Sequence, residues 1–299
     1  MYRIKNLEIY ASEIAEFLNQ ELSGENFIVK NPASINNIKE NSLLFIENEK
    51  FNIEKIAVNN VLVISKLSFK HKNNVSLIIS KNPKLDFLRI LNEFFIENDI
   101  YKISDSAKID SRAKIDRNVS IGENVVIGAD VIIKNNTQIL NNVVINGSVE
   151  IGSNCIIKDN STIGGIGYDF ETDENGLPYY YPHIGKIIIE DNVWIGSNTS
   201  IESASLDNTI IHKHVKIDDL VQIGCNCIIN KSSMITAGVI VSRNVLIGEN
   251  CWIAPNATII EDIKIGDNVT VGAGSVVLND LENDSVYVGN PAYLLKTKK

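Results

Sequence analysis

The sequence predicts a mainly β fold, in which a left-handed parallel β-helix of hexapeptide repeats follows a small N-terminal α/β domain. First, isoleucine or valine recurs at every sixth residue over long stretches between residues 103 and 277. Second, glycine, asparagine or aspartate accompanies these residues in most hexapeptides. Third, the residues before position 101 lack this repeat and carry helical and strand-like patterns instead.

Residues 1–100 are expected to form the α/β domain. The segment "EIYASEIAEFLNQEL" has apolar residues at helical spacing, which predicts a first helix. The runs "FIVK", "SLLFI", "VLVIS" and "VSLIIS" are typical of short strands. The segment "NPKLDFLRILNEFF" predicts a second helix, with Pro83 in its first turn.

The β-helix is expected over residues 101–280. The repeat runs from Ile103 to Ile163 and resumes at Ile189 after a loop. Neither the helix period nor the strand period places an apolar residue at every sixth position. A short fixed repeat of this kind is typical of a parallel β-helix. Each hexapeptide supplies a strand with an inward isoleucine and a turn in which glycine, asparagine or aspartate accepts a positive φ. Three hexapeptides make one coil, so residues one coil apart stack at about 4.8 Å.

Two interruptions and a tail complete the organisation. Residues 164–186 form a loop insertion rich in glycine and tyrosine, which we expect to contact a ligand or a neighbouring subunit. Residues 202–209 are expected to form only a bulge, and residues 281–299 form the C-terminal tail.

Composition excludes several classes of function. The net charge of −9 argues against nucleic acid as a partner. No apolar stretch is long enough to span a membrane, and the N-terminal residues lack a secretory signal. The four cysteines have no zinc spacing, so we expect free thiols in a cytoplasmic protein without a metal.

The chain resembles the UDP-3-O-acylglucosamine N-acyltransferases of lipid A synthesis over nearly its whole length. Similar motifs are "NPKLDFLRIL", "GGIGYDF", "YPHIGKIIIEDNVWIGSNTSI" and "LDNTII". That family holds its uracil ring with an asparagine and an aromatic residue, and "LFIENEKF" stands at this place here. The resemblance therefore implies nucleotide contacts from Phe45, Asn48 and Phe51, because an amide can pair with a pyrimidine edge and a phenyl ring can stack on its face. The alternative is that Phe45 and Phe51 belong to the domain core.

The chain departs from this family at the catalytic position. The family's catalytic histidine lies in Q-I-A-H-N, whereas this chain has "QIGCN", with Cys225 at the histidine position. One coil further, Arg243 stands where the family uses a glycine N–H to hold the oxyanion. The family's I-D-R-G-A segment is "IESAS" here, so Glu202 stands at the place of the family's aspartate.

Two residues are candidates for handling the proton of an attacking amine: His183 and Glu202. Asn226, next to Cys225 in the motif, is the third candidate catalytic residue. Cys225 is not expected to be essential, because a nucleophilic thiolate needs a basic or cationic neighbour and the sequence places no base beside it. A mechanism without a protein base is also open, in which the amine arrives neutral and the departing thiolate takes its proton.

The C-terminal end resembles acetyl-CoA-dependent hexapeptide acyltransferases instead. It contains "WIAPNATI" and "GNPAYLLKTKK" and lacks the helical extension with which the lipid A family engages acyl carrier protein. This resemblance implies an acyl-CoA donor, contacted by Arg243, Gly272, Ala273, Asn290 and Lys296. The net charge of −9 favours the same donor, because acyl carrier protein is acidic and its partners usually offer a basic patch.

Together these observations predict an N-acyltransferase that moves an acyl group from acyl-CoA to the amine of a dTDP- or UDP-linked deoxyamino sugar in surface polysaccharide or glycan biosynthesis. The alternatives are a UDP-3-O-acylglucosamine N-acyltransferase that uses acyl carrier protein, and a non-catalytic nucleotide-sugar-binding relative. A zinc hydratase is disfavoured because His212 and His214 have no evident third partner. We expect a homotrimer with sites between neighbouring β-helices.

Overall fold

The computed structural model describes residues 3–5, 8–47, 56–68, 74–97 and 101–298. The chain divides into two compact units, Met1–Asp99 and Ile100–Lys299. Strands make up 37% of the structure and helices 7%, and the second unit is a left-handed parallel β-helix, as the hexapeptide repeat predicts.

The first unit contains a five-stranded sheet in the order β3-β8-β7-β6-β5. Its strands are β3 (Leu22–Ser23), β5 (Asn31–Pro32), β6 (Ser42–Ile46), β7 (Val61–Ser65) and β8 (Val75–Ile79). Two short pairs flank it, β1 (Arg3–Ile4) with β9 (Ile96–Glu97) and β2 (Ile9–Tyr10) with β4 (Ile28–Val29). The predicted run "FIVK" is reduced to β4, and the other three predicted strands are present.

Both predicted helices are present in the first unit. Helix α1 spans Ala11–Phe17 and buries Ile14. Helix α2 spans Pro83–Ile90, with Pro83 in its first turn and the Asn82 side chain capping it, and it continues as the π-helix η2, Leu91–Phe95. The proline fits there because the first-turn N–H groups lack helical acceptors.

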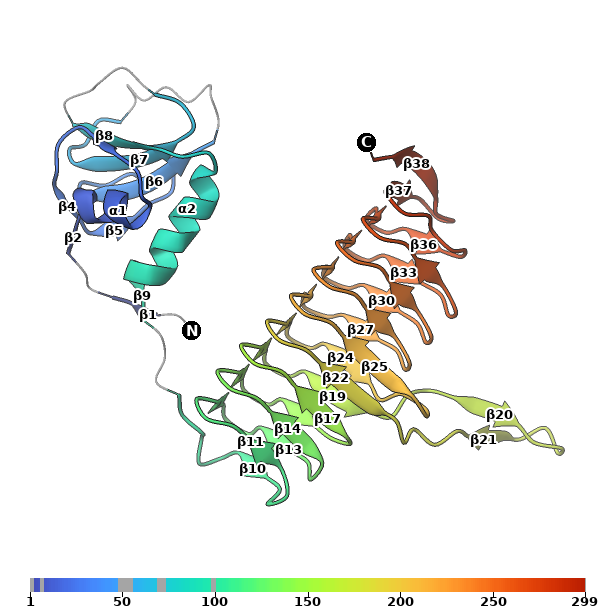
Figure 1. Cartoon of the computed structure of the whole chain (residues 1–299). Coiled ribbons are helices and arrows are strands. Elements are labelled where there is room, and N and C mark those ends of the chain that lie inside the picture. The colour runs from blue at the N-terminus through green and yellow to red at the C-terminus, as the bar shows by residue number, and fades with distance from the viewer. Residues whose placement is uncertain (1–2, 6–7, 48–55, 69–73, 98–100, 299) are drawn as a thin grey trace. The chain divides into compact units, whose positions relative to one another are not determined.

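The β-helix has three faces, each a sheet of parallel strands, apart from the antiparallel β38 at the end of the third (Figure 1). The first face contains β10 (Lys108–Ile109), β13 (Val126–Ile127), β16 (Val144–Ile145), β19 (Thr162–Gly165), β24 (Ser200–Glu202), β27 (Gln222–Ile223), β30 (Ile240–Val241), β33 (Thr258–Ile259) and β36 (Val276–Val277). The second contains β11 (Lys114–Ile115), β14 (Val131–Ile133), β17 (Val149–Ile151), β22 (Lys186–Ile189), β25 (Asn208–Ile211), β28 (Ile228–Ile229), β31 (Leu246–Ile247) and β34 (Lys264–Ile265). The third contains β12 (Ser120–Ile121), β15 (Gln138–Ile139), β18 (Ile156–Ile157), β23 (Trp194–Ile195), β26 (Lys216–Ile217), β29 (Met234–Ile235), β32 (Trp252–Ile253), β35 (Thr270–Val271), β37 (Ser285–Val288) and β38 (Tyr293–Thr297).

Inward isoleucine and valine side chains form one continuous core along the β-helix. Each pairs with the equivalent residue of the next coil, as Ile127 does with Ile145. Ile103 is 47% exposed, although it pairs in register with the buried Ile121 of the next coil. Ile103 lies in the first coil, where no preceding coil covers it.

Asparagine residues in the turns make the predicted positive φ possible. Asn118, Asn136 and Asn154 have φ values of 57°, 59° and 58°. Their side chains also form a ladder, in which the amide of Asn118 donates to Asn136 and that of Asn136 donates to Asn154. Asparagine tolerates this left-handed conformation better than most residues do, so each coil can turn at this residue.

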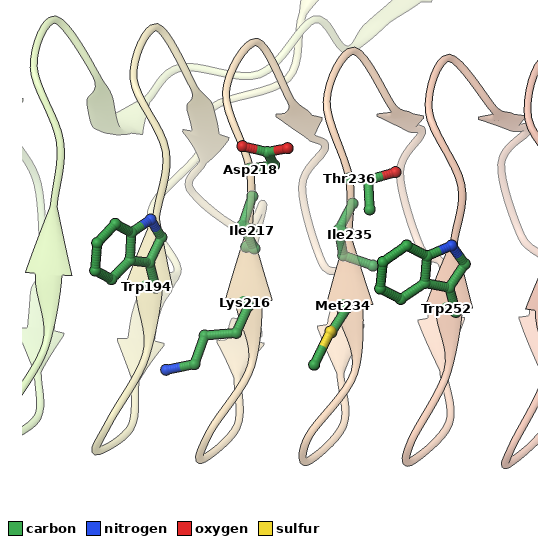
Figure 2. A pocket seen from close by; sticks show the side chains of 8 residues that line it. All are labelled: Trp194, Lys216, Ile217, Asp218, Met234, Ile235, Thr236 and Trp252. Carbon is green, nitrogen blue, oxygen red and sulfur yellow. The ribbon is translucent and has the colours of Figure 1, made fainter. Parts of the chain in front are cut away.

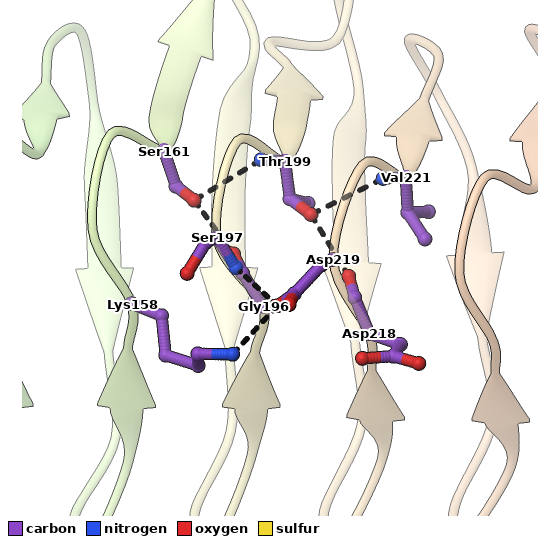
Figure 3. Close-up of polar contacts among 8 residues, drawn as sticks. All are labelled: Lys158, Ser161, Gly196, Ser197, Thr199, Asp218, Asp219 and Val221. Carbon is purple, nitrogen blue, oxygen red and sulfur yellow. Dashed lines mark hydrogen bonds and ion pairs between the residues drawn. The ribbon is translucent and has the colours of Figure 1, made fainter.

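Buried hydroxyl groups satisfy backbone atoms at one corner of the β-helix (Figure 3). The Ser161 hydroxyl donates to the Gly196 carbonyl at 2.6 Å and accepts from the Thr199 N–H at 3.1 Å. The Lys158 ammonium reaches across two coils to Asp219 at 2.7 Å, and that carboxylate also accepts from the Ser197 N–H. These contacts tie together neighbouring coils at the level where the long loop leaves the repeat.

The loop insertion contains a hairpin, β20 (Phe170–Thr172) with β21 (Pro178–Tyr180), which projects away from the coils (Figure 1). The second interruption lies between β24 and β25, and the strand pairing shifts register near Gly165 and Glu202. The tail continues the third face as β37 and then folds back as β38. In the described residues, no helix is long and apolar enough to cross a membrane.

An inward isoleucine should contribute far more to stability than an outward one. Ile247 is fully buried, whereas Ile240 is 43% exposed. We expect Ile247→Ala to lower the free energy of unfolding by about 2–5 kcal/mol because it leaves a cavity, and Ile240→Ala to lower it much less. Urea unfolding of both variants measures the difference, and equal losses would contradict the assigned core.

Candidate active site

A cavity of roughly 410 Å³ lies beside the corner at which the first face turns toward the second. The coils contribute the ends of β24, β27 and β30, and the start of the loop insertion closes one side. Its lining residues are Tyr168, Asp169, Phe170, Glu202, Gln222, Gly224, Cys225, Ser242, Arg243 and Glu261. The structure therefore brings together Glu202, Cys225 and Arg243, three of the residues singled out in the sequence.

Glu202 is the ionisable residue in this cavity best suited to accept a proton. Burial raises the pKa of its carboxyl above the ordinary value, although contacts with Gln222, the Cys225 N–H and His183 oppose this effect. The Gln222 amide donates to one Glu202 oxygen at 3.2 Å. A carboxylate with a raised pKa is a stronger base than an exposed one, and this suits it to accepting a proton.

Cys225 occupies the cavity wall as a protonated thiol. The residue is only 2% exposed. Burial raises the pKa of its thiol above the ordinary value, a hydrogen bond with Ser205 opposes this effect, the Glu202 and Asp169 carboxylates add to it, and Arg243 lowers the pKa slightly. The thiolate that a nucleophile requires is therefore disfavoured at this position.

The single arginine of the cavity is paired within it. Arg243 donates to Asp169 of the loop at 2.8 Å, which also fastens the loop to the coils. Glu202 and Glu261 line the same cavity without a second cation among its lining residues. The excess of carboxylates favours a cationic ligand such as an ammonium group.

His183 lies behind Glu202 and is not part of the cavity lining. Its Nδ1 lies 3.0 Å from both the Tyr180 hydroxyl and the Tyr181 carbonyl. Its Nε2 is buried and has no hydrogen-bond partner among the described residues. The structure thus places this candidate close to Glu202 but outside the cavity lining.

The Asn226 side chain is engaged in the turn. Its carbonyl oxygen accepts from the Ser205 N–H at 3.0 Å, and its amide donates to Asn244 at 2.9 Å. Its φ of 59° is the left-handed value of the turn asparagines. These contacts give Asn226 a role in holding the second interruption against the coil.

The residues expected to contact CoA are separated within one chain. Arg243 follows β30 on the first face, whereas Gly272 and Ala273 follow β35 on the third face. Asn290 forms the Asn290–Pro291 cis peptide between β37 and β38, and Lys296 pairs with Val286 in that hairpin. The cavity around Glu202 therefore includes Arg243 alone among them.

The expected nucleotide contacts fall only partly within the described residues. Phe45 is half-buried and packs against Phe87, with ring centroids 5.0 Å apart, at the edge of the first unit's core. This is the alternative placement named above for this residue. Asn48 and Phe51 lie outside the described residues, so their contact with a nucleotide stays a prediction.

A second hollow of roughly 330 Å³ lies on the third face (Figure 2). Trp194 and Trp252 stand at its two ends, with Lys216 and Met234 between them. Burial lowers the pKa of the Lys216 ammonium, which donates to the Asn192 carbonyl. This apolar hollow belongs to another face than the cavity around Glu202, and no part of the proposed chemistry uses it.

Sequence reasoning missed two features of the site. One is Gln222, which contacts Glu202 because they lie on adjacent strands. The other is the Asp169 carboxylate, whose place beside Arg243 depends on how the loop folds back. The coil spacing could have indicated the first, whereas no pattern in the sequence indicates the second. Across the described ranges, no group of three or more metal-binding side chains occurs.

Family models match three parts of the chain. Residues 244–279 match "Bacterial transferase hexapeptide (six repeats)", and residues 186–210 match "Hexapeptide repeat of succinyl-transferase". Residues 97–167 match "GMPPB C-terminal domain". All three matches fall within or at the start of the β-helix unit.

Solved structures share the β-helix fold. LpxA from Acinetobacter baumannii superposes with a TM-score of 0.59 at 25% identity, over 67% of this chain and 74% of that chain. LpxA of Bacteroides fragilis, described as a UDP-N-acetylglucosamine acyltransferase, has a TM-score of 0.59 at 24% identity, over 66% and 74% of the two chains.

Curated relatives carry the name UDP-3-O-acylglucosamine N-acyltransferase. The protein from Porphyromonas gingivalis is 42% identical over 85 residues, which are 28% of this chain and 24% of the relative. A protein of Legionella pneumophila named UDP-3-O-acylglucosamine N-acyltransferase 2 is 45% identical over 87 residues, 29% of this chain and 25% of the relative. The matched part thus spans about a quarter of each relative's length. The repeats, the fold and the similarity to these relatives lead to one conclusion. The chain is a hexapeptide-repeat protein that resembles the UDP-3-O-acylglucosamine N-acyltransferases.

Proposed function

We propose that this protein is an acyltransferase which moves an acyl group from a thioester to the amine of a UDP-linked sugar. The observation that carries the proposal is Glu202, a half-buried carboxyl with a raised pKa in a cavity that has an excess of carboxylates. The similar proteins named UDP-3-O-acylglucosamine N-acyltransferase support both the amine and the UDP group.

The cavity suits an amine acceptor. A sugar ammonium entering it meets Glu202 and Glu261, whose charges Arg243 does not neutralise because it is paired with Asp169. Once the amine is neutral, its lone pair attacks the thioester carbonyl. The C–N bond forms and the proton released from nitrogen passes to Glu202. Glu202 gives this proton to the sulfur as the C–S bond breaks, so that the amide and a free thiol leave and the carboxylate is restored.

Comparison with known proteins favours the UDP-sugar reading over a dTDP-linked sugar. The curated relatives from Porphyromonas gingivalis and Legionella pneumophila are named for a UDP-linked sugar. They therefore support the lipid A type of reaction better than the acyl-CoA reaction inferred from the tail. Parallel assays with acyl carrier protein thioesters and acyl-CoA, each with a UDP-linked amino sugar, test the proposed activity and identify the donor; no product with either donor would contradict it.

Replacing Glu202 should remove most of the activity. Glu202→Gln keeps the size of the side chain and its contact with Gln222 but cannot accept the proton, so we expect kcat to fall by about 10²–10⁴-fold. In the unmodified protein, kcat/KM should rise with pH through the raised pKa of Glu202, since only the ionised form is a base. Glu249→Gln on an exposed turn is the matched control, and an unchanged kcat in Glu202→Gln would refute the role of Glu202.

Replacing Cys225 should matter little. Its thiol is held protonated by burial and by the neighbouring carboxylates, and a second thioester on the enzyme gives no advantage over the donor's own thioester. We expect Cys225→Ala and Cys225→Ser to keep kcat/KM within about tenfold, which corresponds to less than about 1.4 kcal/mol. Mass spectrometry of the protein after turnover provides the check, because an acylated Cys225 would show covalent catalysis.

The protein should assemble as a homotrimer. The three flat faces of a β-helix allow side-by-side packing of prisms, and the loop insertion offers exposed Tyr168 and Tyr179 for contact with a neighbour. Analytical ultracentrifugation at assay concentration should give three times the mass of the 33.1 kDa chain. A fully active monomer would be incompatible with sites shared between subunits.

A further inference from the structure

The imidazole of His183 is held in a defined orientation behind Glu202. Nδ1 has two neighbours at 3.0 Å, the Tyr180 hydroxyl and the Tyr181 carbonyl, and the Tyr180 and His183 rings are stacked with centroids 5.9 Å apart. With a proton on Nδ1 the ring donates to the Tyr181 carbonyl, which can only accept a hydrogen bond, and without that proton Nδ1 accepts from the Tyr180 hydroxyl. Both arrangements hold the ring in the same orientation.

The glycine at position 167 keeps this nitrogen close to Glu202. A Cβ atom added to Gly167 would lie 2.6 Å from His183 Nε2 and 3.1 Å from Glu202 Oε2. The side chain of any larger residue at position 167 would therefore fill the space between the His183 imidazole and the Glu202 carboxylate. The backbone of Gly167 does not have a positive φ, so the need for glycine here comes from this space alone.

A proton taken up by His183 would be placed next to the carboxylate. In an imidazolium both ring nitrogens carry a proton, so its Nε2–H lies near Glu202 across Gly167. A cation at this distance favours the ionised form of a carboxyl, and His183 accordingly lowers the pKa of Glu202 against the effect of burial.

We propose that Tyr180, His183 and Gly167 form a positioning unit, which holds an imidazole behind Glu202 and keeps this carboxylate available as the proton acceptor. The inference rests on the proposed function of Glu202 in acyl transfer. None of the three residues lines the cavity, so they act on a substrate only through Glu202.

Other charged and titratable groups face Glu202 from the elements packed around it. Asp169 belongs to the loop, Cys225 follows β27, Arg243 follows β30, and Glu261 follows β33. Arg243 is paired with Asp169, and Cys225 is protonated, so these groups offer no unpaired cation beside Glu202. His183 is the neighbour that can supply positive charge from behind.

The experiment measures the ionisation of Glu202 directly. In protein labelled with ¹³C-glutamate, the Glu202 carboxyl signal is assigned by its loss in Glu202→Gln and followed over pH. We expect His183→Asn and Gly167→Ala each to move its titration midpoint upward by about one pH unit. Tyr180→Phe should move it in the same direction. Gly165→Ala is the matched control, because a Cβ there meets only the Thr162 methyl at 3.8 Å.

A double variant separates the positioning role from mere crowding of Glu202. With His183 already replaced, Gly167→Ala should cause no further shift, since its effect acts through the imidazole. An equal shift of Gly167→Ala in both backgrounds, or an unchanged midpoint in His183→Asn, would overturn the proposal. The measurement needs no turnover, so it stands apart from the assays of acyl transfer, whose failure would instead refute the proposed function.

Discussion

Stacking of coils through parallel backbone hydrogen bonds is the constraint on which the rest of the β-helix depends. Each short strand is too small to be stable alone and finds its donors and acceptors only in the coils before and after it. Residues at equivalent positions must therefore share both orientation and size, which is why inward isoleucine repeats so strictly. The turn asparagines serve the same constraint, because they allow every coil to turn at the same place.

The candidate site lies where this regularity is interrupted. The loop insertion leaves the coil after β19, the second interruption follows β24, and the cavity forms between them and the coils above. At this cavity the start of the loop insertion supplies Tyr168, Asp169 and Phe170 as one wall. The Arg243–Asp169 ion pair then fixes the loop against the repeat.

Burial acts on two neighbouring acids in the same direction but with different chemical consequences. It raises the pKa of both Glu202 and Cys225. For the thiol, whose ordinary pKa is already above neutral, this removes the thiolate and with it a nucleophile. For the carboxyl, whose ordinary pKa is far below neutral, it increases basicity while leaving the ionised form accessible. The same pocket thus disfavours covalent catalysis by Cys225 and favours proton transfer by Glu202.

The sequence by itself determined the β-helix, the place of its two interruptions and the presence of Cys225 at an unusual position. These features depend on a local repeat, in which every hexapeptide has the same pattern of apolar and turn residues. The periodicity of the sequence is therefore enough to reveal them. Only the tertiary structure decided that His183 lies behind Glu202, that Arg243 is paired with Asp169, and that Gly272 and Lys296 lie away from the cavity. These contacts join the irregular loop and tail to particular coils, and no repeat in the chain encodes the path by which an irregular segment folds back.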